Sequence, residues 1–182
     1  MKVTRLSIPD VCLIEPEVFG DARGFFLTSW QEAAFRRAVA DVAFVQDNQS
    51  RSRQGTLRGL HFQAQHTQGK LVRCVAGRVF DVAVDIRRSS PTFGRWIGTE
   101  LSEDNHHQLW IPPGFAHGFY VLSASADLHY KVTDQYHPAS ERTLLWDDPA
   151  VGVAWPLPDG GSPLLSPKDA VGAVLADLET LP

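Results

Sequence analysis

The residues best suited to chemistry are a histidine, a lysine and a tyrosine that interrupt apolar, strand-like segments of this 182-residue chain. His61 lies in residues 57–63, Lys70 opens the next segment, and Tyr130 lies within residues 128–132. A neutral histidine suits proton abstraction, a lysine ammonium can stabilise an oxyanion, and a tyrosine hydroxyl can donate a proton. Carbon-acid chemistry beside a carbonyl requires these three groups. If the base and the acid face opposite sides of one carbon, the stereocentre inverts.

The spacing of Arg58 and His61 leaves two interpretations open. Successive side chains of a regular strand point to opposite faces, so residues three apart would point away from each other. Glycine within a strand often marks a bulge, and a bulge at Gly59 would bring both side chains into one cavity. Otherwise His61 is a hydrogen-bonded core histidine and Arg58 is a solvated charge at the rim.

The elements that would position these residues are short strands. Apolar segments recur at intervals of roughly 8–12 residues, which is typical of an antiparallel sandwich or barrel. A closed sheet points alternate side chains of every strand into one lumen, so polar residues from different strands would meet there. The predicted strands are one or two within 1–17, and then 44–48, 56–63, 70–75, 79–86, 95–101, 108–111, 118–122, 128–134 and 142–146.

Two helices are predicted, one near each end of the chain. Ser29 and Glu32 form a capping-box pattern that opens a helix over residues 29–39. Ser166 is a candidate N-cap for a second helix that continues to Leu178, with Asp169 in its first turn. The whole chain, 1–182, is then one domain. It comprises N-terminal strands and a helix (1–43), a barrel core (44–155), and a C-terminal loop and helix (156–182).

Composition excludes several classes of partner. The net charge of −4 gives no nucleic-acid signature. Residues 1–10 contain no signal-peptide core, and no apolar run is long enough to cross a bilayer. The cysteines, Cys12 and Cys74, lie far apart in apolar surroundings. We therefore expect a reduced, cytoplasmic protein with neither nucleic-acid nor membrane partners.

The sequence patterns for metal binding, nucleophilic hydrolysis and phosphate binding are weaker than the pattern for acid–base chemistry. His61 lacks a second histidine two residues later, where Gln63 stands, and His106 and His107 lie in a polar turn. These positions do not form a converging ligand set, so no metal is predicted. Ser50 and Ser52 lack the glycine setting of a nucleophile elbow, and no glycine-rich phosphate loop precedes a helix.

A series of ordered motifs closely resembles the dTDP-4-dehydrorhamnose 3,5-epimerase family, whose members have a cupin-type jelly roll. Two of them are LRGLHFQ at 57–63 and IPPGFAHG at 111–118. The resemblance extends from about residue 5 to residue 170. It implies a mainly β protein, a cupin-type antiparallel jelly-roll barrel with short helices near both ends. The motifs occupy residues 20–26, 44–48, 57–63, 77–85, 90–94, 110–119, 130–134 and 166–169.

The resemblance also implies roles for individual residues. His61 would remove the sugar protons, and Asp169 would pair with it and orient its ring. Lys70 would stabilise the enolate, and Tyr130 would return a proton from the opposite face. Further positions match residues that hold the nucleotide diphosphate or the sugar in the family, with two aromatic residues near the thymine. They are Arg23, Gln46, Asn48, Arg58, His117, Glu141 and Lys168, together with Phe26 and Tyr136.

The implied function is epimerisation of a dTDP-linked 4-keto-6-deoxy sugar at C3 and C5 without cofactor or metal. The implied assembly is a homodimer that exchanges N-terminal strands. Thr28 occupies a position where the family commonly carries a glutamate that contacts the nucleotide. Four alternatives stay open. They are a monoepimerase acting at one carbon, a related sugar ketoisomerase, a non-catalytic nucleotide-sugar binding module and a metal-dependent cupin enzyme.

Overall fold

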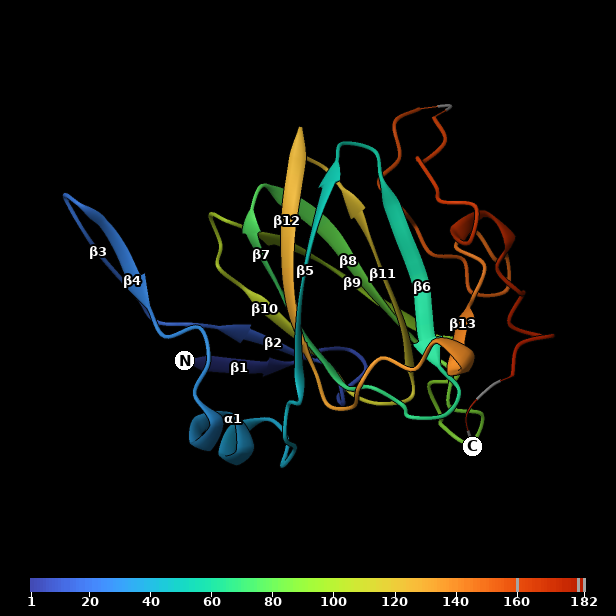
Figure 1. Ribbon diagram of the computed structural model, residues 1–182, viewed down its shortest axis with the longest axis horizontal. Coiled ribbons are helices and arrows are strands. Elements are labelled where there is room, and N and C mark those ends of the chain that lie inside the picture. The colour runs from blue at the N-terminus through green and yellow to red at the C-terminus, as the bar shows by residue number, and fades with distance from the viewer. Residues whose placement is uncertain (160, 180, 182) are drawn as a thin grey trace.

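Two antiparallel sheets form the framework of the protein in a computed structural model that describes residues 1–159, 161–179 and 181. Figure 1 shows the sheets facing one another. The first has the order β1 (Lys2–Arg5), β2 (Cys12–Glu15), β10 (Gln108–Ile111), β7 (Lys70–Ala76), β12 (Ser125–Val132) and β5 (Gln46–Arg53). The second has the order β13 (Glu141–Thr143), β6 (Leu57–Gln63), β11 (Phe115–Val121), β8 (Arg78–Asp85) and β9 (Trp96–Ser102). The prediction of a mainly β, antiparallel jelly roll is confirmed.

The main core lies between the sheets. Val72 and Leu128 come from the first sheet, and Val79, Leu101 and Val121 come from the second or its edges; all five are fully buried. These β-branched and leucine side chains stand at alternate strand positions, which explains why the apolar pattern of the sequence located most strands. Around these residues the space between the sheets is filled by apolar side chains, and another part of that space holds the polar cavity described below.

The outer faces of the sheets are covered by different parts of the chain. Helix α1 (Glu32–Ala38) places Phe35 against Trp110 on the outside of the first sheet. The C-terminal segment covers the second sheet, where Leu175 and Leu178 pack with the fully buried Leu144. Each sheet is therefore buried on both faces over part of its area. Among the described residues, no helix is long and apolar enough to span a membrane.

Strand β5 is longer than the sequence pattern predicted. The predicted strand covered residues 44–48, whereas β5 spans Gln46–Arg53 and pairs along its full length with β12. Gln46, Asn48 and Ser50 point inward to line a cavity, so the buried face of this edge strand is polar. The period of two is present, but both faces of the strand carry polar side chains, with three charged residues and a glutamine at the outward positions. A search for alternating apolar residues therefore missed it.

Both predicted helices need correction. The first begins at Glu32 with Gln31 at its N-cap and no side-chain capping bond, because the chain at Ser29 is still tied to the first sheet through its carbonyl and Gln108 Nε2. The predicted C-terminal helix is wrong: only the 3₁₀ turn η2 (Asp169–Val171) forms there. Beyond it, Ala173 exchanges backbone hydrogen bonds with Thr143 and Leu145, and this extended pairing replaces the helical bonds. A second 3₁₀ turn, η1 (Pro138–Ser140), precedes β13.

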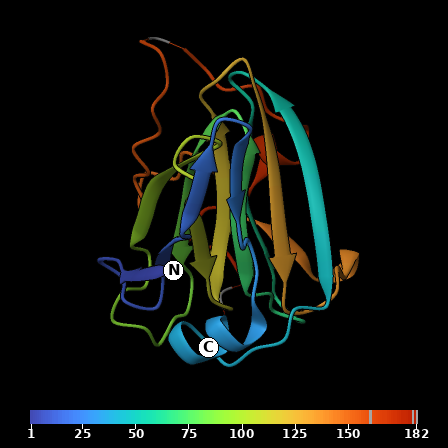
Figure 2. The ribbon, with the colours of Figure 1, turned by 90° about the vertical axis from the view of Figure 1, so that its left-hand side faces the viewer.

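The hairpin formed by β3 (Val18–Asp21) and β4 (Gly24–Leu27) stands apart from the two sheets. Figure 1 shows it projecting from the body beside the N-terminus, on the side away from the C-terminal segment, and Figure 2 shows the same hairpin turned toward the viewer. Three of its aromatic side chains, Phe19, Phe25 and Phe26, are more than half exposed. This hairpin contains the turn that the two glycines around Asp21 and Arg23 predicted.

Candidate active site

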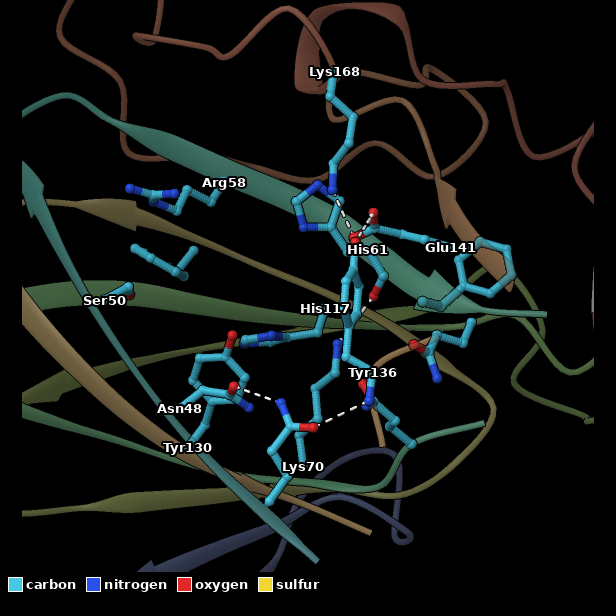
Figure 3. Close-up of a pocket in the computed structure, with 15 residues that line it drawn as sticks. Asn48, Ser50, Arg58, His61, Lys70, His117, Tyr130, Tyr136, Glu141 and Lys168 are labelled. Atoms are coloured by element: carbon cyan, nitrogen blue, oxygen red, sulfur yellow. Dashed lines mark hydrogen bonds and ion pairs between the residues drawn. The ribbon is translucent and has the colours of Figure 1, made fainter. Parts of the chain in front are cut away.

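A cavity of about 370 Å³ opens between the two sheets. This volume lies within the range of roughly 300–1,000 Å³ that is usual for small-molecule sites. Figure 3 shows side chains from both sheets entering it. Its lining residues are Gln46, Asn48, Ser50, Lys70 and Tyr130 from the first sheet; Arg58, His61, Phe62, Gln63, His117, Phe119 and Glu141 from the second; and Gln68, Tyr136 and Lys168 from the connecting segments.

A bulge in β6 aims Arg58 and His61 into the same cavity. Across the ladder, His117 of β11 pairs with His61 and Phe119 pairs with Arg58, so three steps along β6 face two steps along β11. Gly59 makes this possible, because its φ of +131° suits only glycine and an added Cβ would meet Gly118 Cα at 2.5 Å. The bulge expected from the sequence is confirmed, and both side chains line one cavity, with Arg58 exposed and His61 partly buried.

His61 and Asp169 form a hydrogen-bonded pair. His61 Nε2 lies 2.6 Å from Asp169 Oδ1, so Nδ1 is the ring nitrogen left to face a ligand. Burial lowers the pKa of His61 and outweighs the opposing effect of the hydrogen bond to Asp169, which leaves the imidazole neutral near pH 7. Burial works against ionisation of Asp169, but bonds from His61 and Ser166 outweigh it and lower the pKa of Asp169 to about 2. A neutral imidazole beside a fixed carboxylate is the arrangement of a general base.

Lys70 supplies a buried cation on the first sheet. Its side chain extends from β7 into the cavity, and Nζ donates to the backbone carbonyl of His61 at 3.2 Å. Burial lowers the pKa of Lys70 to about 8, although the charges of Asp81 and Glu141 act in the opposite direction. The ammonium is therefore still charged at pH 7, in a setting where water is largely excluded and its field is strong.

Tyr130 faces His61 from the opposite sheet. It lies on β12, and Figure 3 shows its ring entering the cavity on the side of Asn48 and Lys70, while His61 and Arg58 enter from β6. Burial raises the pKa of Tyr130, and the nearby Arg58 charge only partly offsets this effect. The phenol therefore keeps its proton at neutral pH and can donate it. A proton acceptor and a proton donor thus lie on opposing walls of one cavity.

His117 carries a partner that the sequence analysis missed. Its Nε2 lies 3.0 Å from both carboxylate oxygens of Asp81, a fully buried residue on the neighbouring strand β8. In the sequence, Asp81 alternates with the apolar residues Phe80 and Val82 of β8. An aspartate at an inward position of an apolar strand was the available signal, since a buried carboxylate needs a partner.

Two groups of hydrogen-bonded polar residues line the cavity. Lys168 Nζ lies 2.6 Å from Glu141 Oε1, and the Tyr136 hydroxyl donates to Glu141 Oε2 at 3.0 Å. Burial favours the neutral form of Glu141, but the bonds from Lys168 and Tyr136 outweigh it and lower the pKa of this carboxyl. In the second group, Gln46 donates to Asn48 and accepts from the Tyr136 backbone N–H. These residues therefore offer hydrogen-bond donors and acceptors, and one positive and one negative charge, beside the exposed ring of Tyr136.

Comparison with known proteins agrees with this geometry. The profile of the dTDP-4-dehydrorhamnose 3,5-epimerase family matches residues 5–177. The chain belongs to this family. The Pseudomonas aeruginosa dTDP-4-dehydrorhamnose 3,5-epimerase is 57% identical over 183 residues and covers 100% of both chains. A Legionella pneumophila dTDP-6-deoxy-D-glucose-3,5-epimerase, solved with dTDP-4-keto-L-rhamnose, superposes with a TM-score of 0.96 at 50% identity, covering 99% of this chain and 97% of that one. A 3'-monoepimerase from Streptomyces bikiniensis is also similar, with a TM-score of 0.87, 35% identity, and coverage of 94% and 86%.

Two of the residues expected in this epimerase site lie elsewhere. Arg23 and Phe26 belong to the projecting β3–β4 hairpin and do not line the cavity of their own chain. The Arg23 side chain is 90% exposed and pairs with its neighbour Asp21 at 2.6 Å. The structure brings the other predicted site residues together, and Asp169 reaches the cavity through His61. Thr28 lies against a separate hollow near the N-terminus.

Several lining residues were not predicted. Ser50, Gln63 and Gln68 contribute polar groups, and Phe62 and Phe119 contribute ring surface. Ser50 could have been found from the alternation of β5 had polar residues been counted as inward ones. Within the described ranges, no three His, Cys, Asp or Glu side chains converge as a metal site would require.

Proposed function

We propose that this protein epimerises dTDP-4-dehydro-6-deoxy-D-glucose at C3 and C5, giving dTDP-4-dehydro-L-rhamnose. The observation that carries the proposal is the placement of His61 and Tyr130 on opposing sheets around one cavity. Membership of the epimerase family and the similarity to an enzyme solved with dTDP-4-keto-L-rhamnose support the same substrate. The two buried free thiols, Cys12 and Cys74, favour work in the reducing cytoplasm.

Each epimerisation consists of two proton transfers. His61 Nδ1 takes the proton from the carbon beside the C4 ketone, and the electron pair of that C–H bond moves into an enolate. Lys70 stabilises the negative charge on the enolate oxygen, while Asp169 stabilises the imidazolium that has formed. Tyr130 then gives its proton to the opposite face of the carbon, and the enolate collapses to the ketone. His61 then releases the abstracted proton to solvent and the Tyr130 phenolate takes one up from solvent, so both groups are restored before the second carbon reacts. The sum is redox-neutral.

The nucleotide end of the substrate is assigned to the part of the cavity that Lys168 and Tyr136 line. Arg58 and Lys168 supply the positive charge that a diphosphate needs, and the exposed Tyr136 ring offers a stacking surface for the base. Gln46 and Asn48 supply amide groups on the first sheet, and His117 supplies a buried ring from the second. Glu141 holds Lys168 in the free protein.

We further assign Arg23 and Phe26 to the cavity of a second subunit in a homodimer. The exposed phenylalanines of the hairpin and its distance from the body favour burial against another copy. Mixing Arg23→Ala and His61→Asn proteins under subunit exchange tests this. Random exchange makes half of the dimers mixed, and each mixed dimer has one intact cavity, so about a quarter of wild-type activity should return. If Arg23 served its own chain, no intact cavity would form and activity would stay absent.

The test of the reaction is deuterium incorporation. The product formed from dTDP-4-keto-6-deoxyglucose in D₂O should carry solvent deuterium at both C3 and C5, as measured by NMR. The His61→Asn variant, which keeps similar size and polarity, should lose turnover by orders of magnitude while its nucleotide affinity changes little.

Other labelling patterns would assign other functions. Label at one carbon alone would indicate a monoepimerase, like the similar Streptomyces bikiniensis protein. Tight nucleotide-sugar binding without any exchange would indicate a binding module. Metal analysis of untagged protein separates the metal-dependent alternative, because stoichiometric iron, zinc or manganese would contradict the proposal.

A further inference from the structure

The carboxylate of Asp169 is held at both oxygens. Oδ1 accepts from His61 Nε2 at 2.6 Å and from the backbone N–H of Gly59 at 3.3 Å. Oδ2 accepts from the hydroxyl of Ser166 at 2.6 Å, and the Ser166 oxygen in turn accepts the Asp169 backbone N–H at 3.2 Å. Ser166 does not line the cavity. Its hydroxyl therefore contacts the pair from behind and has no route to the sugar.

The bond to Oδ2 decides the rotation of the carboxylate. Asp169 sits on the short turn η2, which contacts β6 through the Gly59 bond and the His61 bond. Both of those bonds converge on one oxygen, so on their own they leave the carboxylate free to turn about its χ2 bond. A donor on the second oxygen removes that freedom, and charge-assisted bonds of this kind are short and strong.

The orientation of the carboxylate matters because it selects the tautomer of His61. With Oδ1 facing Nε2, the proton of the neutral ring stays on Nε2, and the lone pair on Nδ1 faces the cavity. With the carboxylate turned away, the ring has no fixed tautomer, and part of the population places its proton on Nδ1. Those molecules cannot accept a proton from a substrate.

We propose that Ser166 is a positioning residue for the epimerase: its hydroxyl fixes the Asp169 carboxylate, which fixes the Nε2-protonated tautomer of His61. This inference rests on the proposed function, in which His61 Nδ1 is the base. It extends the functional unit from a pair of side chains to three, with Ser166 outside the cavity.

Kinetics of Ser166→Ala provide the first test. The variant should lose about tenfold in kcat, which corresponds to ~1.4 kcal/mol in the barrier, because the reactive tautomer becomes a minor population. KM for the dTDP-sugar should stay within about twofold, since Ser166 contacts no part of the cavity. Ser166→Thr keeps the hydroxyl and should restore kcat. A raised KM with an unchanged kcat in Ser166→Ala would overturn the proposal. So would a Ser166→Thr variant whose kcat is not restored.

Ring-nitrogen NMR provides a test that needs no turnover. In ¹⁵N-histidine protein near pH 8, the His61 signals, assigned by their loss in His61→Asn, should report protonation at Nε2. In Ser166→Ala they should move toward the average of the two tautomers, and in Ser166→Thr they should return. Identical His61 signals in wild type and Ser166→Ala would overturn the proposal.

A matched control is Ser123→Ala. Ser123 also accepts a backbone N–H and donates to a backbone carbonyl, but it ties a turn near Arg78, outside the cavity. It should change neither kcat nor the His61 spectrum. If wild-type protein gives no deuterium exchange, the proposed function fails, while the NMR comparison still decides whether Ser166 fixes the pair.

Discussion

The buried ammonium of Lys70 makes the reaction rate sensitive to alkaline pH. Burial lowers the pKa of Lys70 to about 8, whereas an exposed lysine titrates near 10.5. The ammonium is the form that stabilises the enolate, so activity requires pH values below this pKa. With a pKa of about 8, about nine-tenths of the Lys70 population is charged at pH 7 and about one-tenth at pH 9. We therefore expect kcat to fall about tenfold between these two pH values.

The assay is initial-rate deuterium incorporation at saturating substrate, in buffers from pH 6.5 to 9.5 at constant ionic strength. Reactions without enzyme correct for base-catalysed exchange of the ketone. Lys70→Arg keeps a positive charge throughout this range and should flatten the alkaline limb, although at a lower overall rate. Lys131→Arg is the matched control, because Lys131 pairs with Asp47 on the outer face of β12 and should leave the profile unchanged.

A rate that stays constant to pH 9.5 in the wild type would refute the reasoning, since it would show that the charge of Lys70 is not required. An alkaline limb that persists in Lys70→Arg would also refute it, because the titrating group would then be another residue.

Three further predictions concern the base, the acid and the core. The lowered pKa of His61 leaves it neutral above pH 6.5, so the acid limb of kcat/KM should lie below that pH; an acid limb that begins above pH 7 would contradict this. Tyr130→Phe should still exchange deuterium into recovered substrate through His61 but form product about 10²- to 10⁴-fold more slowly; wild-type product formation would exclude the acid role. Leu144→Ala should lower the free energy of unfolding by about 2–5 kcal/mol in urea denaturation, because it opens a cavity under the C-terminal segment. A loss below about 1 kcal/mol would show that this segment contributes little to stability.

The strands were predictable wherever one face of the chain is apolar. The inward residues of β7, β8 and β12 are largely valine, leucine and alanine, and the sequence located these strands to within three residues at each end. Strand β5 was only half found because its inward face consists of Gln46, Asn48, Ser50 and Ser52. A strand that lines a polar cavity loses the hydrophobic alternation that reveals other strands.

The C-terminal segment shows the opposite error. Residues 166–178 have a helical start signal and helix-forming alanines and leucines, yet after η2 the chain forms an extended bridge at Ala173 and then a turn over residues 175–177. Gly172 lies so close to the backbone of Leu145 that an added Cβ would approach its atoms at 2.8 Å. Backbone bonds across this contact and burial of Leu175 against the second sheet outweigh a local propensity of a few tenths of a kcal/mol per residue.

The chemical groups and the class of fold could be read from the amino-acid order alone, because residue types and apolar periodicity are local properties of the chain. Residue types identified His61, Lys70 and Tyr130 as candidates, and the resemblance of the ordered motifs added Asp169. Only the tertiary structure decided how they meet. The bulge at Gly59 turns Arg58 and His61 into one cavity, and the packing of the two sheets places Tyr130 opposite them. Asp169 contacts His61 although the two residues are 108 positions apart in the chain. Such contacts depend on how the whole chain packs, and no local pattern contains that information.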